Sequence, residues 1–177
     1  MLILVSGGSA SGKSAFAEGL ITASGIERRV YLATMEAYGE EGERRVRRHL
    51  ELRRGKGFST LELPRGLDDA KLPEGSAVLI EDVGNLVANE CFTTEAGFDG
   101  AASRAVRGVL RLAEQNALTV AVTNELGADG VFGMGYSEDT VRYIRLMAEV
   151  NAALASAAGE VYEVVSGVPM RLKGDVE

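Results

Sequence analysis

The chain has 177 residues, 46% of them hydrophobic, and a net charge of −7, which is the composition of one globular domain. A net acidic chain is a poor match to nucleic acid, because binding by charge requires a basic surface. The single cysteine excludes an internal disulfide framework. The apolar run at residues 2–5 is too short for a signal peptide or a membrane span. We therefore expect one soluble, cytoplasmic domain over residues 1–177.

Five short apolar runs, which begin at Leu2, Val30, Ala77, Leu118 and Val161, predict strands. They are rich in Val, Ile and Leu without clean alternation, as in strands that are buried on both faces. Helical patterns lie between them at residues 14–23, 41–54, 101–116 and 139–158, and we expect loops at 89–100 and 127–135. Alternating strands and helices predict an α/β fold, in which helices cover a mostly parallel sheet in three layers.

The first apolar run leads into a glycine-rich loop, GGSASGKS, at residues 7–14. Between a strand and a helix, G-x-x-x-x-G-K-[ST] is the pattern of a loop that binds the phosphates of a nucleoside triphosphate, through its backbone N–H groups and the helix N-terminus. Lys13 would contact the β- and γ-phosphates, and the Ser14 hydroxyl would coordinate Mg²⁺. The motif narrows the expected fold to a single-domain, P-loop NTPase-like (RecA-like) sandwich. The candidate nucleotide-binding residues of this loop are Gly7, Gly8, Ser9, Ala10, Ser11, Gly12, Lys13 and Ser14.

Two acidic residues, Glu81 and Asp82, end the strand expected from Ala77. A carboxylate at this position would hold the metal ion or one of its waters. The pattern does not choose between the two carboxylates, and an acidic pair that is merely solvated at the strand end is the alternative.

The only histidine, His49, lies in an arginine-rich helical pattern, with six arginines in residues 44–54. Arg45 and Arg53 are one helical turn away on the same face. This cluster would attract a triphosphate and keep the imidazole neutral, as attack on a phosphorus atom requires. The alternative is an exposed amphipathic helix with Glu–Arg pairs, in which the histidine has no chemical role.

Several segments, in the same order, resemble the bifunctional adenosylcobinamide kinase/adenosylcobinamide-phosphate guanylyltransferase family. They are the glycine-rich loop, VYLATMEA at 30–37, ERRVRRHLELR at 43–53, VTNELG at 122–127 and the run 150–173. The resemblance nearly spans the chain and implies two reactions. In one, the γ-phosphoryl group of ATP or GTP moves to adenosylcobinamide. In the other, a histidine carries GMP from GTP, as a phosphoramidate, to adenosylcobinamide phosphate, which gives adenosylcobinamide-GDP.

The resemblance also implies site residues, cofactors and partners. His49 matches the guanylylated histidine, so that it and Lys13 would be the catalytic residues. Mg²⁺ would be held by Ser14 and by Glu81 or Asp82, GTP and ATP would be substrates, and a corrinoid would be the acceptor. Family members are usually homo-oligomers, and we expect a trimer. Further nucleotide-binding residues implied by the resemblance are Ala33, Thr34, Met35, Leu50, Glu51, Leu52, Arg53, Glu62 and Glu81.

Two other functions fit part of the sequence. In a single-activity P-loop small-molecule kinase, His49 would be structural, and no nucleotide would become attached to the protein. A nucleotide-binding module without turnover would fit residues 128–147, which lack the pattern that the family has before its terminal helix.

Overall fold

The computed structural model describes residues 1–36, 44, 51, 54–126 and 135–174. Within these residues, a seven-stranded sheet has the strand order β3-β2-β4-β5-β1-β6-β7. Every pair of neighbouring strands is parallel except β6 and β7. The strands are β1 (Leu2–Ser6), β2 (Arg29–Ala33), β3 (Phe58–Glu62), β4 (Ala77–Glu81), β5 (Leu118–Val122), β6 (Glu160–Val165) and β7 (Val168–Lys173).

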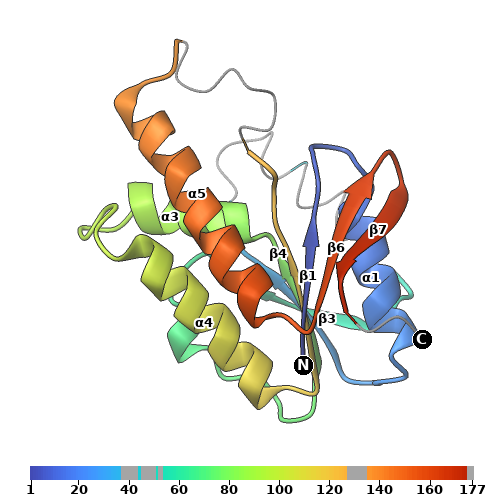
Figure 1. The fold of residues 1–177 in the computed structure, drawn as a ribbon. Coiled ribbons are helices and arrows are strands. Elements are labelled where there is room, and N and C mark those ends of the chain that lie inside the picture. Colours follow the sequence, from blue (N-terminus) through green and yellow to red (C-terminus); the bar gives the residue numbers. More distant parts are fainter. Residues whose placement is uncertain (37–43, 45–50, 52–53, 127–134, 175–177) are drawn as a thin grey trace.

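Helices cover both faces of this sheet (Figure 1). Helix α1 (Lys13–Ala23) packs on one face, while α3 (Val83–Phe92), α4 (Ala101–Gln115) and α5 (Glu138–Ala157) pack on the other. Each central strand contributes alternate side chains to the two apolar clusters: Leu2 and Leu4 lie on the α3–α5 side, and Ile3 and Val5 on the α1 side. This two-sided burial explains the unbroken apolar runs and confirms the predicted three-layer α/β fold.

All five predicted strands are present, but strands β3 and β7, helix α3 and the short 3-10 helix Leu67–Asp69 were not predicted. Strands β3 and β7 lie at the two edges of the sheet, and all six residues of β7 are exposed. Helix α3 continues to Phe92, so the predicted loop at 89–100 was wrong in its first part. The helix predicted at 41–54 and the loop predicted at 127–135 lie mainly outside the described residues. Within the predicted helix, the described residues Arg44 and Glu51 are helical.

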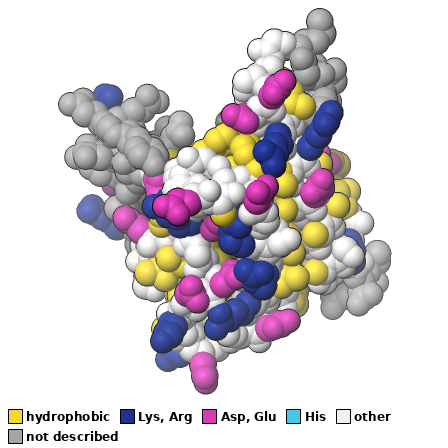
Figure 2. All heavy atoms as spheres, turned by 90° about the vertical axis from the view of Figure 1, so that its left-hand side faces the viewer, with side chains coloured by type: hydrophobic (Ala, Val, Ile, Leu, Met, Phe, Trp, Pro, Cys, Tyr) yellow, Lys and Arg dark blue, Asp and Glu magenta, His cyan; other side chains and the backbone are white. Residues whose placement is uncertain are grey.

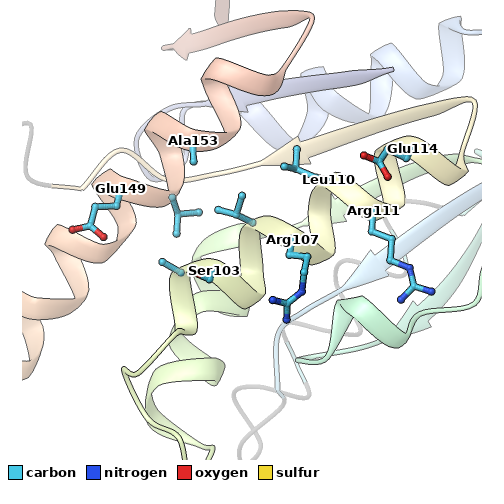
Figure 3. A pocket seen from close by; sticks show the side chains of 10 residues that line it. Ser103, Arg107, Leu110, Arg111, Glu114, Glu149 and Ala153 are labelled. Atoms are coloured by element: carbon cyan, nitrogen blue, oxygen red, sulfur yellow. The ribbon is translucent and has the colours of Figure 1, made fainter.

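The α3–α5 side of the molecule carries an open groove. Figure 2 shows apolar side chains among charged ones on this side. The groove runs between α4 and α5, with Val106 and Leu110 on one wall and Val150 on the other, and Arg107 and Glu149 also line it (Figure 3). No predicted site residue lines this groove, so the predicted site lies elsewhere. Among the described helices, none is both long and apolar enough to cross a membrane.

Candidate nucleotide site

The predicted site residues that the structure describes gather at the carboxyl edge of the sheet. The strand register places Ala33 opposite Glu62 on one side and opposite Glu81 on the other. The glycine-rich loop follows Ser6 at the end of β1, whose neighbour β5 ends at the same edge. Ligands of open α/β sheets bind at this edge.

The glycine-rich loop is held against the turn between β6 and β7. A Cβ on Gly7 would lie 2.6 Å from the carbonyl oxygen of Val164, and a Cβ on Gly12 would lie 3.3 Å from the Cα of Gly167. The Gly167 N–H donates to the carbonyl oxygen of Ser11 at 2.8 Å. The loop therefore needs glycine at both positions, because the backbone of the turn occupies the space that a side chain would fill.

Lys13 and Ser14 form the first turn of α1, directly after the loop. The buried Lys13 donates from Nζ to the carbonyl oxygen of Gly8 at 2.9 Å, so its ammonium group lies over the loop. Ser14 donates from Oγ to Oε1 of Glu81 at 2.7 Å. The N-cap residue, Gly12, has no side chain, so it leaves the first N–H groups of α1 available to phosphate oxygens.

Glu81 and Asp82 have different surroundings, although they are adjacent. Burial raises the pKa of Glu81 to about 7, and the hydrogen bond from Ser14 opposes this only in part. Its second oxygen, Oε2, is buried and has no hydrogen-bond partner among the described residues. Asp82, in contrast, accepts from the Asn85 N–H at 2.7 Å and from Nδ2 of Asn124 at 3.2 Å. Glu81 is thus the carboxylate with an oxygen left for a cation.

The other predicted residues differ in how exposed their side chains are. Thr34 is fully buried; its hydroxyl donates to the carbonyl oxygen of Asp82 at 2.7 Å, and its N–H donates to that of Glu81 at 3.0 Å. Ala33 and Met35 are half-buried, and Glu62 and Glu51 are exposed. The remaining predicted residues lie outside the described residues; they are His49, Leu50, Leu52 and Arg53.

One polar residue of the site was missed by sequence reasoning. Asn151 of α5 accepts from the Thr123 hydroxyl at 2.6 Å and donates to the carbonyl oxygen of Asn124 at 3.1 Å, which fixes the chain after β5. An asparagine beside the buried positions Met147, Val150 and Leu154 is the signal that would have found it, because a polar side chain on an apolar helix face needs partners.

Glu81→Gln is expected to stabilise the ligand-free protein at high pH. Because burial raises the pKa of Glu81 from 4.5 to about 7, the folded protein keeps a proton in this range that the unfolded chain has lost. The stability linked to this proton is complete below pH 4.5 and decreases as the pH rises through about 7. In urea unfolding at about pH 8, the free energy of unfolding of the variant should therefore exceed that of wild type by about 3 kcal/mol, and the difference should nearly vanish at about pH 4.

Glu62→Gln is the matched control for this prediction. Glu62 ends β3 as Glu81 ends β4, but it is exposed, so its substitution should leave the pH dependence of stability unchanged. The same pH dependence in Glu81→Gln and wild type would contradict the prediction.

The family model described as "Cobinamide kinase / cobinamide phosphate guanyltransferase" matches residues 3–172. The chain belongs to this family. The predicted membership of the cobinamide kinase/guanyltransferase family, and with it the transferase class, is confirmed.

Relatives of known function cover nearly the same length. The bifunctional adenosylcobalamin biosynthesis protein CobU of Salmonella typhimurium is 34% identical, with 98% of this chain and 100% of the relative aligned. CobU of Escherichia coli is 32% identical with the same coverage. The bifunctional adenosylcobalamin biosynthesis protein CobP of Pseudomonas aeruginosa is 31% identical, with 97% of each chain aligned.

Solved structures with a similar fold are more distant. The flagellar accessory protein FlaH of Methanocaldococcus jannaschii matches with a TM-score of 0.51 and 12% identity, over 98% of this chain and 78% of its own. An ATPase of a bacterial type III secretion system matches with a TM-score of 0.55 and 12% identity, over 92% of this chain and 50% of its own. At such identities the similarity concerns the fold alone, and it confirms the predicted P-loop NTPase-like architecture of this cobinamide kinase/guanyltransferase family member.

Proposed function

We propose that this chain phosphorylates adenosylcobinamide with ATP or GTP and transfers GMP from GTP, through His49, to adenosylcobinamide phosphate. The observation that carries the proposal is the pairing of Ser14 with Glu81 at 2.7 Å, next to Lys13 on a phosphate-binding loop, in a member of this family. The loop supplies backbone N–H groups, Lys13 supplies a positive charge and Glu81 supplies a carboxylate. Phosphoryl transfer requires groups of these three kinds.

The kinase half uses the loop and the first turn of α1. Backbone N–H groups and Lys13 bind the phosphates, so that Lys13 exchanges its bond to the Gly8 carbonyl oxygen for bonds to phosphate oxygens. The hydroxyl oxygen of adenosylcobinamide then attacks the γ-phosphorus and its proton passes to water, while the bond from the γ-phosphorus to the β–γ bridging oxygen breaks and the nucleoside diphosphate leaves. The reaction is accelerated because the site positions the two substrates and neutralises the negative charge of the phosphates.

The donor atoms at Ser14 and Glu81 fit Mg²⁺. A hydroxyl and a carboxylate oxygen are hard ligands, and the partnerless Oε2 of Glu81 is directed to no other group among the described residues. Phosphate oxygens and waters would complete the coordination. When bound, Mg²⁺ would neutralise part of the negative charge of the triphosphate.

The guanylyltransferase half uses His49 as a nucleophile. An imidazole nitrogen attacks the α-phosphorus of GTP, a P–N bond forms, and the bond to the bridging oxygen breaks, releasing pyrophosphate. The phosphate oxygen of adenosylcobinamide phosphate then attacks the same phosphorus and breaks the P–N bond. The product is adenosylcobinamide-GDP, and His49 is regenerated. The arginines of residues 44–54 would balance the charge of the leaving pyrophosphate.

Intact-protein mass measured after incubation with GTP and Mg²⁺ tests this proposal. The wild-type protein should gain the mass of GMP and lose it when adenosylcobinamide phosphate is added, as adenosylcobinamide-GDP appears. No gain while GTP binds and adenosylcobinamide is phosphorylated would favour the single-activity kinase. Binding without either turnover would favour the nucleotide-binding module. We also propose that the enzyme works in the cytoplasm as a homo-oligomer, whose size sedimentation would give.

A further inference from the structure

The segment that follows β5 runs alongside the glycine-rich loop. The Thr123 N–H donates to the carbonyl oxygen of Val5 at 2.9 Å, and the Glu125 N–H donates to that of Gly7 at 3.4 Å. The parallel pairing of β5 with β1 thus continues beyond Val122, the last residue of β5. It brings the backbone of Glu125 against the first residue of the loop.

Glu125 and Lys13 bond to consecutive residues of this loop. The Lys13 Nζ lies 2.9 Å from the carbonyl oxygen of Gly8, where phosphate oxygens would replace that partner. Gly7, which binds the Glu125 N–H, is the residue before Gly8, and consecutive Cα atoms are about 3.8 Å apart. The backbone of Glu125 therefore lies beside the position proposed for the β- and γ-phosphates, at a distance that a glutamate side chain can bridge.

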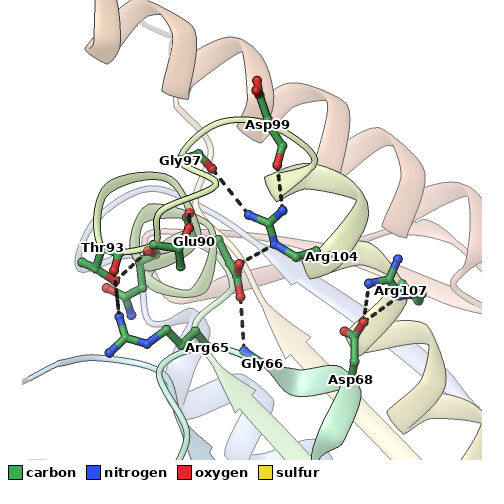
Figure 4. A network of polar contacts seen from close by, with 11 residues as sticks. Arg65, Gly66, Asp68, Glu90, Thr93, Gly97, Asp99, Arg104 and Arg107 are labelled. Atoms are coloured by element: carbon green, nitrogen blue, oxygen red, sulfur yellow. Dashed lines mark hydrogen bonds and ion pairs between the residues drawn. The ribbon is translucent and has the colours of Figure 1, made fainter.

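The carboxylate of Glu125 is available to a ligand. Its side chain is exposed and has no hydrogen-bond or ion-pair partner in the part of the chain that the structure describes. Carboxylates around α3 and α4 are engaged instead: Glu90 accepts from the Arg104 Nε at 2.7 Å, and Asp68 accepts from the Arg107 Nε at 2.6 Å (Figure 4). The oxygens of Glu90 and Asp68 thus hold the fold together, whereas those of Glu125 do not.

The strand order separates Glu125 from other acidic residues at the carboxyl edge. Neighbouring strands lie about 4.8 Å apart, and β5 is the direct neighbour of β1 in the order β3-β2-β4-β5-β1. Glu36 follows β2 and Glu62 ends β3, so they lie three and four spacings from β1, or roughly 14 Å and roughly 19 Å. Glu81 ends β4, two spacings away, and is bonded to Ser14. On this side of β1, Glu125 is thus the nearest of these carboxylates to the loop.

We propose that Glu125 is the general base of the kinase step, and this inference rests on the proposed function. Its carboxylate accepts the proton of the adenosylcobinamide hydroxyl while the hydroxyl oxygen bonds to the γ-phosphorus. The bond from that phosphorus to the β–γ bridging oxygen breaks, the nucleoside diphosphate leaves with the electron pair, and Glu125 then passes the proton to water. Guanylyl transfer needs no such base, because the attacking nitrogen of a neutral imidazole carries no proton.

The experiment compares Glu125→Gln with Glu114→Gln in the full-length protein. Glutamine has nearly the shape of glutamate, but its amide is not a base. Glu114 is the matched control, because it is also exposed and its substitution removes the same charge. It lies near the end of α4, which leads into the amino end of β5. The measurements are the rate of adenosylcobinamide phosphorylation at saturating substrates, the GTP concentration that gives half of that rate, and the rate of GMP-adduct formation.

We expect Glu125→Gln to phosphorylate adenosylcobinamide about 100-fold more slowly, with half-saturation by GTP within about threefold of wild type. Its adduct formation, and all three quantities in Glu114→Gln, should change by less than about twofold. Equal kinase rates in the two variants would overturn the inference. So would an equal loss of both reactions in Glu125→Gln, since it would indicate a role in GTP binding. If the wild type phosphorylates no adenosylcobinamide, the proposed function fails, and the inference fails with it.

A second glutamate, on the other side of β1, is the rival for this role. Glu163 of β6 lies opposite Ser6, directly before the loop. It alternates with Val164, which belongs to the apolar cluster on the α1 side, so Glu163 faces the side of α5. We expect Glu163→Gln to keep the phosphorylation rate within about threefold of wild type. A 100-fold loss in Glu163→Gln, with a normal rate in Glu125→Gln, would assign the proton to Glu163 and overturn the inference.

Rescue by an added carboxylate distinguishes proton transfer from a structural role. Glu125→Ala leaves space at an exposed position, so acetate should raise its phosphorylation rate about tenfold. Acetate should not rescue Glu125→Gln, because the glutamine side chain fills that space. No rescue of Glu125→Ala by acetate would contradict the role of Glu125 as the proton acceptor.

Discussion

Replacing His49 with alanine is expected to abolish the GMP adduct and to leave the phosphorylation of adenosylcobinamide within about threefold of wild type. The chain has one histidine, so a guanylyl-histidine can form at no other position. In the proposed function, the kinase step depends instead on Lys13, Ser14 and Glu81, which lie on α1 and β4. Intact-protein mass after incubation with GTP, and the initial rate of phosphorylation of adenosylcobinamide, measure the two effects.

The chemical stability of the adduct is the control for the His49 result. A P–N bond to imidazole should be cleaved in acid and survive in base, unlike an ester to serine or tyrosine. His49→Asn keeps a polar side chain without the nucleophile and should lose the adduct as well. An adduct at wild-type level on either variant would assign the covalent step to another residue. Loss of both activities would show that the role of His49 extends beyond GMP transfer.

Lys13→Ala is expected to lower both the kinase rate and the rate of adduct formation by at least about 100-fold. The Lys13 ammonium group is buried over the loop, with its Nζ 2.9 Å from the Gly8 carbonyl oxygen, where phosphate oxygens would replace that partner. Alanine removes this charge from a site where water screens it poorly. Both rates, measured with the same protein preparation, show whether one triphosphate site serves the two reactions.

Lys56→Ala is the matched control for Lys13→Ala. Lys56 also places its ammonium group against α1, where it pairs with Glu18, but on the surface. Its loss removes the same charge from the chain and should change each rate less than about twofold. If adduct formation survived in Lys13→Ala while the kinase rate fell, the GTP for guanylyl transfer would bind away from the glycine-rich loop.

The sequence predicted the buried parts of the fold better than its edges. Strands β1, β2, β4 and β5 are enclosed on both faces, so their apolar runs are unmistakable. Strands β3 and β7 are largely exposed and mix polar with apolar residues, so their local pattern is weak. Helix α3 was not predicted, and its last residues were assigned to a loop, because Asn89 and Glu90 are polar residues whose partners, Pro64 and Gly66, lie far away in the sequence.

The candidate site was predictable only to the level of residue types. The glycine spacing predicts the loop, Lys13 and Ser14, because backbone conformation and phosphate chemistry impose it. The choice between Glu81 and Asp82 depends on hydrogen bonds from Asn85 and Asn124, which no local pattern contains. The burial of the Thr34 side chain likewise follows from the packing of β2 beside β4.

The contact between the glycine-rich loop and the last hairpin also bears on the order in which the protein matures. Gly7 and Gly12 emerge from the ribosome well before Val164 and Gly167, which pack against them. Until β6 and β7 exist, the loop lacks the backbone that supports it and the Gly167 N–H that binds Ser11. The proposed nucleotide site is therefore complete only once the hairpin has been synthesised, and we expect a nascent or clipped chain without the hairpin to bind GTP weakly.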